Sequence, residues 1–110
     1  MISTVIALVA AASAAQASDT TRAAREAFTL CLRNYVNQSI EARKDQAAFD
    51  AEFPQQCATQ EAAFRQAVIR RDTAMRATRA NAEESANLEV EDARANFSDR
   101  FAAAMTPRAQ

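Results

Sequence analysis

The sequence predicts an all-α fold, and three observations support this prediction. Glycine is absent from the 110 residues, and proline occurs only twice, as Pro54 and Pro107. Alanine, arginine, glutamate and glutamine are abundant, and all four are good helix formers. β-Branched residues are scattered instead of alternating with polar ones, so no segment has the pattern of a strand. We therefore expect helices along most of the chain.

The N-terminus has the pattern of a secretory signal peptide. Residues 1–17, MISTVIALVAAASAAQA, contain no charged side chain. Their apolar run, from Val5 to about Ala15, is shorter than the ~20 residues that a membrane-spanning helix needs. It ends in Ala15-Gln16-Ala17, a small-x-small pattern after which signal peptidase cleaves, although no Lys or Arg precedes the run. The alternative is a short buried helix.

Removal of residues 1–17 would leave a helical domain over residues 18–106 and a frayed tail over residues 107–110. This part carries all thirteen basic and fourteen acidic residues of the chain. Such a nearly neutral balance gives no general attraction to nucleic acid or to an anionic membrane. We expect a bacterial periplasmic or secreted protein with no nucleic-acid partner and no stable membrane span after signal removal.

The first helix of the domain is predicted from about Asp19 or Thr20 to about Lys44. One face carries residues spaced by three or four positions, which places them along a single helical stripe. This stripe consists of Ala24, Phe28, Cys31, Tyr35, Ser39 and Ala42. The sequence Arg43-Lys44-Asp45 is the most plausible turn in a chain without glycine, and Asp45 is a good N-cap for the next helix.

A reversal at Lys44 brings the two cysteines together. In the resulting antiparallel hairpin, Cys31 faces Cys57 and Tyr35 faces Phe53. The apolar residues after the turn also form one stripe, namely Phe49, Phe53, Cys57, Phe64 and Val68. An even pair of cysteines in an oxidising compartment indicates a structural disulfide. A redox-active pair usually has the spacing C-x-x-C, which is absent here.

Two later features leave alternatives open. Pro54 either kinks the second helix, or residues 45–52 form a separate short helix and Pro54 opens the main one. Beyond it, the chain either turns near residues 81–87, with Asn81 or Asn87 in a left-handed C-cap, or continues as one long C-terminal helix. The first choice gives a three-helix bundle, which we favour. The third stripe consists of Val90, Ala93, Phe97, Phe101 and Ala104.

Two blocks of charge follow each other in the second half of the chain. The basic block contains Arg65, Arg70, Arg71, Arg76 and Arg79, and the acidic block contains Glu83, Glu84, Glu89, Glu91 and Asp92. Charge runs are usually solvated faces. Alternatively, the blocks meet within a fold-back or between two chains, so these ten residues form a possible charge-mediated contact surface.

Catalytic and cofactor sites are not expected. Without histidine the chain has no Ser-His or Cys-His pair and no imidazole metal ligand. Without glycine it lacks the phosphate-binding loops that require this residue. Glu84, Asn87 and Glu91 share a helical face, but calcium needs six to eight oxygens around it. We expect no enzyme activity, no cofactor and no metal.

The sequence thus favours a secreted helical interaction or structural module, binding an unknown envelope protein or itself. The alternative is a periplasmic chaperone-like or inhibitor-like binding protein. Several apolar residues lie off the predicted stripes, and they either cover a third helix or contact a partner. They are Leu30, Val36, Ile40, Ile69 and Leu88.

Overall fold

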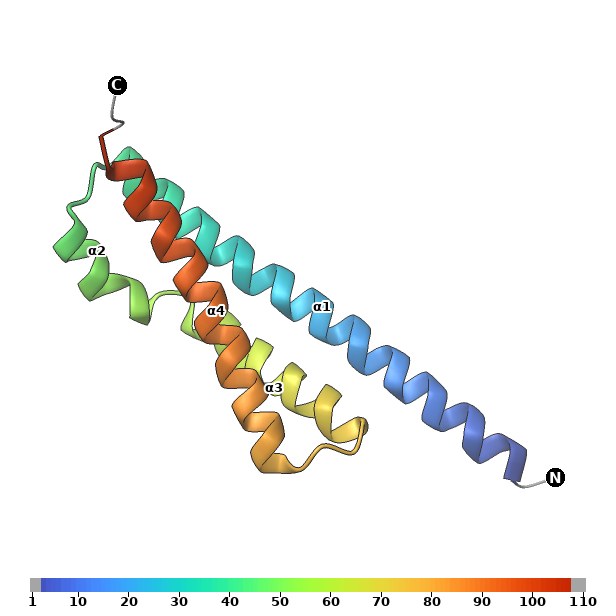
Figure 1. Ribbon diagram of the computed structural model, residues 1–110. Coiled ribbons are helices and arrows are strands. Elements are labelled where there is room, and N and C mark those ends of the chain that lie inside the picture. Colours follow the sequence, from blue (N-terminus) through green and yellow to red (C-terminus); the bar gives the residue numbers. More distant parts are fainter. Residues whose placement is uncertain (1–2, 108–110) are drawn as a thin grey trace.

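The structure is a computed structural model that describes residues 3–107, with side chains from residue 15 onward. Its elements are α1 (Ser3–Glu41), α2 (Gln46–Glu52), the 3-10 helix η1 (Phe53–Gln55), α3 (Ala58–Ala74) and α4 (Arg79–Met105). Figure 1 shows α1, α3 and α4 packed side by side, with α2 near the C-terminal end of α1. The described residues contain no strand, so the predicted all-α fold is confirmed.

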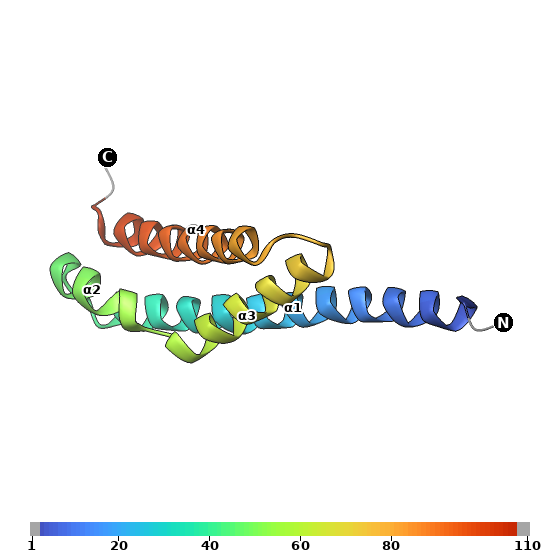
Figure 2. The ribbon, with the colours of Figure 1, turned by 90° about the horizontal axis from the view of Figure 1, so that it is seen from below.

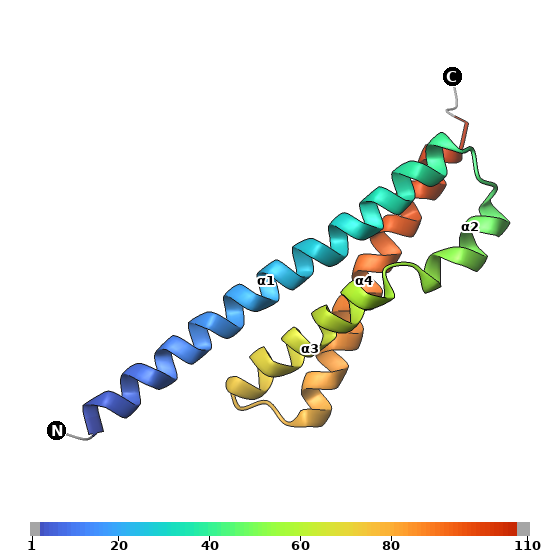
Figure 3. The same ribbon diagram turned by 180° about the vertical axis from the view of Figure 1, so that it is seen from behind.

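The three long helices form a bundle in which α3 runs antiparallel to α1 and α4 runs parallel to it. The Cys31–Cys57 disulfide joins α1 to the start of α3, and Arg25 of α1 pairs with Glu89 of α4. Seen from below, α4 lies on one side of the layer that α1 and α3 form (Figure 2). The N-terminal part of α1 extends past the turn between α3 and α4 (Figure 3).

The predicted turn after the first helix is confirmed. Helix α1 ends at Glu41, three residues before the expected end, and Arg43 adopts a left-handed conformation with φ 53°. The amide of Lys44 donates to the Ser39 carbonyl, which is the 6→1 bond of a Schellman motif. The Asp45 carboxylate accepts a bond from the Ala48 amide at 2.8 Å and thereby caps α2.

The separate short helix before Pro54 is also confirmed, but Pro54 does not open the main helix. It lies in η1, and α3 begins only at Ala58. Between them Gln56 is extended and Cys57 is left-handed, so the helical bonds are interrupted. This break lets α2 cross to α4, where the Phe49 and Phe101 rings stack with their centroids 3.9 Å apart.

A three-helix bundle is found instead of one long C-terminal helix, but the predicted position of its turn was wrong. The chain turns at residues 75–78, before Asn81 and Asn87, which both lie within α4. Arg76 takes the left-handed position (φ 70°), and the Ala77 amide bonds to the Asp72 carbonyl. The Thr78 hydroxyl caps the Asn81 amide at 3.1 Å. A threonine N-cap therefore starts α4, whereas the sequence analysis expected an asparagine C-cap to end the preceding helix.

The core contains most of the predicted apolar stripes. Its fully buried members include Phe28, Phe49, Phe64, Val68, Val90 and Phe101. Leu32 is also completely buried, although it lies beside the stripe predicted for the first helix. Helix α1 contacts both α3 and α4, and so it buries a wider face than a two-helix hairpin needs. Of the off-stripe residues, Val36 and Ile69 are buried, whereas Leu30 and Leu88 are exposed.

Helix α1 begins at Ser3, so the expected start near Asp19 or Thr20 was wrong for the full chain. The alanine-rich apolar run is itself a good helix former and continues α1 without a break. Cleavage after Ala17 stays a prediction. Within residues 3–107, no helix combines the length and the apolar character needed to cross a membrane. Of the predicted frayed tail, Pro107 follows the end of α4, and residues 108–110 lie outside the described part.

Candidate functional site

The disulfide joins Cys31, on the buried side of α1, to Cys57, the residue immediately before α3. The two Cα atoms are 6.0 Å apart, within the usual range for a disulfide. No free cysteine remains in the chain, because it has only these two. The predicted covalent link between the first two long helices is therefore confirmed.

Cys57 occupies an unusual backbone position. Its φ of 62° lies in the left-handed region, which non-glycine residues seldom adopt, and its side chain does not cap α3. Its carbonyl accepts the Glu61 amide at 2.9 Å, which begins the hydrogen bonding of α3. The disulfide consequently fixes the residue at which the chain changes direction between η1 and α3.

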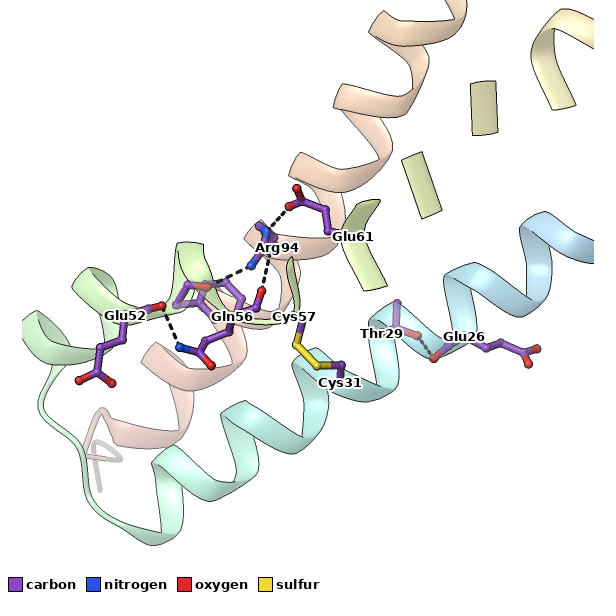
Figure 4. Close-up of a disulfide and its surroundings, with 9 residues drawn as sticks. Glu26, Thr29, Cys31, Glu52, Gln56, Cys57, Glu61 and Arg94 are labelled. Carbon is purple, nitrogen blue, oxygen red and sulfur yellow. Dashed lines mark hydrogen bonds and ion pairs between the residues drawn. A yellow bond between two sulfur atoms is a disulfide. The ribbon is translucent and has the colours of Figure 1, made fainter. Parts of the chain in front are cut away.

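Arg94 of α4 holds the same turn from the opposite side (Figure 4). Its guanidinium donates to the Phe53 carbonyl at 3.0 Å and to the Gln56 carbonyl at 2.7 Å. Its Nε donates to the Glu61 carboxylate at 2.8 Å. The side chain is only 15% exposed, so these bonds lie largely out of water. One side chain thus holds three partners: Phe53 in η1, Gln56 in the turn that follows it, and Glu61 in α3.

The surroundings of Arg94 explain its burial and its charge pairing. Its guanidinium lies 5.3 Å from the ring centroid of Phe28 and 5.5 Å from that of Phe53, a cation–π geometry. Partial burial alone would raise the pKa of the Glu61 carboxyl. Hydrogen bonds from Arg94 and Arg65 outweigh this effect and hold the pKa of Glu61 below its ordinary value.

The main polar side chain that the sequence analysis missed is Arg94. A signal was available: Arg94 lies four residues after Val90 and three before Phe97, so it borders the apolar stripe of α4. A cation beside a buried stripe needs partners of opposite charge or carbonyl oxygens. Those partners lie in η1, in the turn after it and in α3, and their approach depends on the geometry of that turn, which the sequence did not define.

The basic block does not form one surface. Arg65 bonds to Glu61 at 3.2 Å and to the Asn87 side chain, and Arg79 pairs with Glu83 at 2.9 Å within α4. Arg71 pairs with Asp72 at 2.9 Å and, across the α3–α4 turn, with Glu89 at 3.0 Å. The two remaining arginines, Arg70 and Arg76, are exposed and form no ion pair among residues 15–107.

The acidic block divides into paired and unpaired members. Glu83 and Glu89 are held by arginines, and Glu89 bridges α4 to both α1 and α3 through Arg25 and Arg71. The others, Glu84, Glu91 and Asp92, are exposed and have no ion-pair partner in the described part of the chain. Fold-back therefore joins the two blocks at Arg71 and Glu89 and leaves three carboxylates outside.

These three carboxylates surround an exposed leucine. Leu88 is 55% exposed and lies four residues after Glu84, three before Glu91 and four before Asp92. Residues at these spacings are neighbours on one helical face. We call Glu84, Leu88, Glu91 and Asp92 the outer face of α4. It is negatively charged, with one large apolar side chain at its centre.

A second polar cluster closes the end of the bundle near α2. Lys44, the only lysine of the chain, pairs with Glu52, and the hydroxyl of Tyr35 donates to the same carboxylate at 3.0 Å. The Lys44 ammonium also lies 5.2 Å from the Tyr35 ring centroid. Hydrogen bonds to Glu52 and Tyr35 raise the pKa of Lys44, so this amine stays protonated and serves as a tether.

The described residues show no pocket and no group of three or more His, Cys, Asp or Glu side chains placed to bind a metal. Of the three oxygen-bearing residues considered in the sequence, Asn87 accepts a bond from Arg65, while Glu84 and Glu91 face solvent.

Comparison of the chain with protein-family models, with curated proteins and with solved structures found no match. The geometry of the molecule is therefore the basis for a functional assignment.

Proposed function

We propose that this protein is an exported, non-catalytic helical interaction module of the bacterial periplasm or extracellular space. It binds an envelope protein through the outer face of α4. The observation that carries the proposal is this face, where Leu88 is exposed among three carboxylates that have no cationic partner within residues 15–107.

The contrast with the carboxylates that are paired between helices supports a binding role. Glu61 and Glu89, which face neighbouring helices, each pair with two arginines. Like charges on one helical face repel one another when no cation neutralises them. A partner that presents Arg or Lys around an apolar side chain would remove this repulsion and cover Leu88. Aromatic residues, methionine and arginine are also enriched at interfaces.

Export is supported by the disulfide and by the N-terminal sequence. Disulfides persist mainly in oxidising compartments, and here the bond lies at the junction of η1 and α3. Residues 1–17 have the composition of a signal peptide. The absence of histidine and glycine from the chain supports a role without catalysis.

Site-specific photocrosslinking tests the binding face, and the chain supplies a matched control. Leu30, on the outer face of α1, is 51% exposed, almost as much as Leu88. A photoreactive residue at Leu88 should crosslink the chain to a discrete envelope protein in the native host, and one at Leu30 should not. Equal crosslinking from both positions, or from neither, would overturn the assignment of this face.

Charge reversal supplies a second, independent measurement. Glu84→Lys with Glu91→Lys should abolish the crosslink from Leu88, whereas Glu26→Lys with Glu41→Lys, on α1, should leave it unchanged. A crosslink to a second copy of the chain, lost at high salt, would identify self-association in place of an envelope partner. Suppression of aggregation of an unrelated client would instead indicate the chaperone-like alternative.

A further inference from the structure

Thr21 is where α1 becomes anchored to the rest of the bundle. It is only 2% exposed, whereas residues 18–20 are exposed. Its hydroxyl lies 2.7 Å from the Ala17 carbonyl, one turn earlier in α1, and 3.2 Å from the Ala67 carbonyl of α3. The segment just before Thr21 is therefore helical but lies outside the packed region.

This anchor lies close to the predicted cleavage position. The Ala17–Ser18 bond is inside α1, which is continuous from Ser3 to Glu41. Proteolysis concentrates where the backbone is exposed and can leave regular structure, and many peptide-binding sites take their ligand as an extended strand. A docked Thr21 opposes such an extension, because its buried side chain is held against α3 while its hydroxyl bonds to the carbonyl of the scissile peptide bond.

The hydroxyl of Thr21 lies within hydrogen-bonding distance of two acceptors. A threonine hydroxyl carries a single proton to donate, so it cannot form two full hydrogen bonds at once. In the uncleaved chain the shorter contact is to Ala17, within the same helix. After cleavage and loss of residues 1–17, Ala67 is the acceptor that remains of these two.

We propose that Ala17–Ser18 is a processing site that is open to cleavage only before Thr21 docks against α3. Cleavage is a hydrolysis by a signal peptidase: water adds to the Ala17 carbonyl carbon, the bond to the Ser18 nitrogen breaks, and that nitrogen receives a proton. Loss of the Ala17 carbonyl then leaves the Thr21 hydroxyl to donate its hydrogen bond to the Ala67 carbonyl of α3. This inference depends on the export part of the proposed function.

Cleavage by purified, detergent-solubilised signal peptidase tests this order of events. The substrates are a free peptide of residues 1–25 and the folded, oxidised full chain, with products located by mass spectrometry. The peptide should be cut after Ala17 at least about tenfold faster than the folded chain, because cleavage of the folded chain depends on its opened population. Equal rates would overturn the inference and leave export intact.

Two variants identify the source of the protection. Thr21→Ala should bring the cleavage rate of the folded chain towards that of the peptide, whereas Thr21→Ser, which keeps the hydroxyl, should remain protected. Circular dichroism confirms that both are folded. If Thr21→Ala does not fold, Thr21→Val, which keeps the shape of the side chain but has no hydroxyl, replaces it. Protection that is unchanged in Thr21→Ala would exclude Thr21 as the anchor, and an uncut peptide would overturn both this inference and the signal assignment.

Discussion

Replacement of Arg76 by glycine should stabilise the protein. Arg76 has φ 70°, in the left-handed region, where an L-residue with a Cβ atom costs roughly 1–2 kcal/mol. Glycine removes this cost but adds roughly 0.5–1 kcal/mol of backbone entropy that folding must overcome. The net expectation is a gain of about 0.5–1 kcal/mol in the free energy of unfolding.

The Arg76 side chain contributes little to the packing of the fold. The side chain is exposed and forms no hydrogen bond or ion pair among the described side chains, so little else is lost with it. The backbone bonds of the turn do not involve the side chain: the Arg76 amide donates to the Thr73 carbonyl at 3.0 Å. Glycine can keep this bond.

Urea denaturation followed by circular dichroism measures the effect, with Arg76→Ala as the reference because it removes the guanidinium but keeps Cβ. Arg76→Gly should be more stable than Arg76→Ala, and Arg43→Gly should behave similarly because Arg43 has φ 53° in an equivalent motif. Ala95→Gly, in the exposed interior of α4, should cost about 1 kcal/mol. A glycine at Arg76 that lowers stability below Arg76→Ala would refute the conformational reasoning.

Three other measurements address the turn between η1 and α3. Replacing both Cys31 and Cys57 by serine should lower the free energy of unfolding by about 3.5 kcal/mol, from the chain-entropy relation for a separation of 26 residues, and an unchanged urea midpoint would contradict this. Arg94→Met should cost about 2 kcal/mol because two carbonyls and Glu61 lose a donor, and it should be non-additive with Glu61→Gln in a double-mutant cycle. Since the folded-state pKa of Glu61 is lowered, its contribution is complete above the unfolded value of about 4.3 and is lost as the pH falls through the folded value. Glu61→Gln should therefore reduce the loss of stability as the pH falls below the unfolded-state value, and an unchanged pH profile would show that Glu61 does not contribute.

The hairpin could be predicted from the sequence because two independent patterns agree on one register. A turn at residues 43–45 aligns the apolar stripes and also aligns Cys31 with Cys57. A shift of one residue would rotate one stripe by about 100° and separate the cysteines. The observed aromatic contact between Tyr35 and Phe53, with centroids 6.1 Å apart, follows from the same register.

The third helix was less predictable because alanine gives a weak pattern. The buried residues at the start of α4 are Ala82 and Ala86, which differ little from the exposed alanines nearby. The residues on both sides of the turn are also good helix formers, and so is Arg76 within it. The sequence therefore contains no glycine or proline that would mark the end of α3. The true signal was Thr78, whose hydroxyl caps α4.

Burial of Leu32 and the role of Arg94 depend on how three helices meet, which no single helical stripe encodes. A helix that packs against two neighbours buries a broader arc than the stripe of a hairpin. Leu32 lies 100° around α1 from Cys31, and Val36 lies one turn after Leu32. The carboxylates on the outer face of α4 were identified from the sequence as part of a charge block. Only the fold separates the paired carboxylates of that block from the exposed ones.

The absence of glycine explains why the disulfide lies where it does. Within residues 3–107 the chain breaks its helices at three left-handed residues, Arg43, Cys57 and Arg76, each at a cost of roughly 1–2 kcal/mol. The breaks at Arg43 and Arg76 are stabilised by Schellman hydrogen bonds and are followed by the N-caps Asp45 and Thr78.

The break at Cys57 has no such local support, because no side chain caps α3 there. Its stabilisation comes from other helices instead: α1 supplies the disulfide, and α4 supplies the two carbonyl bonds of Arg94. The total stability of a small domain is only about 5–15 kcal/mol, so the cost of a third break without support would be a substantial fraction of it. Long-range links are therefore placed at the one turn that the local sequence does not stabilise.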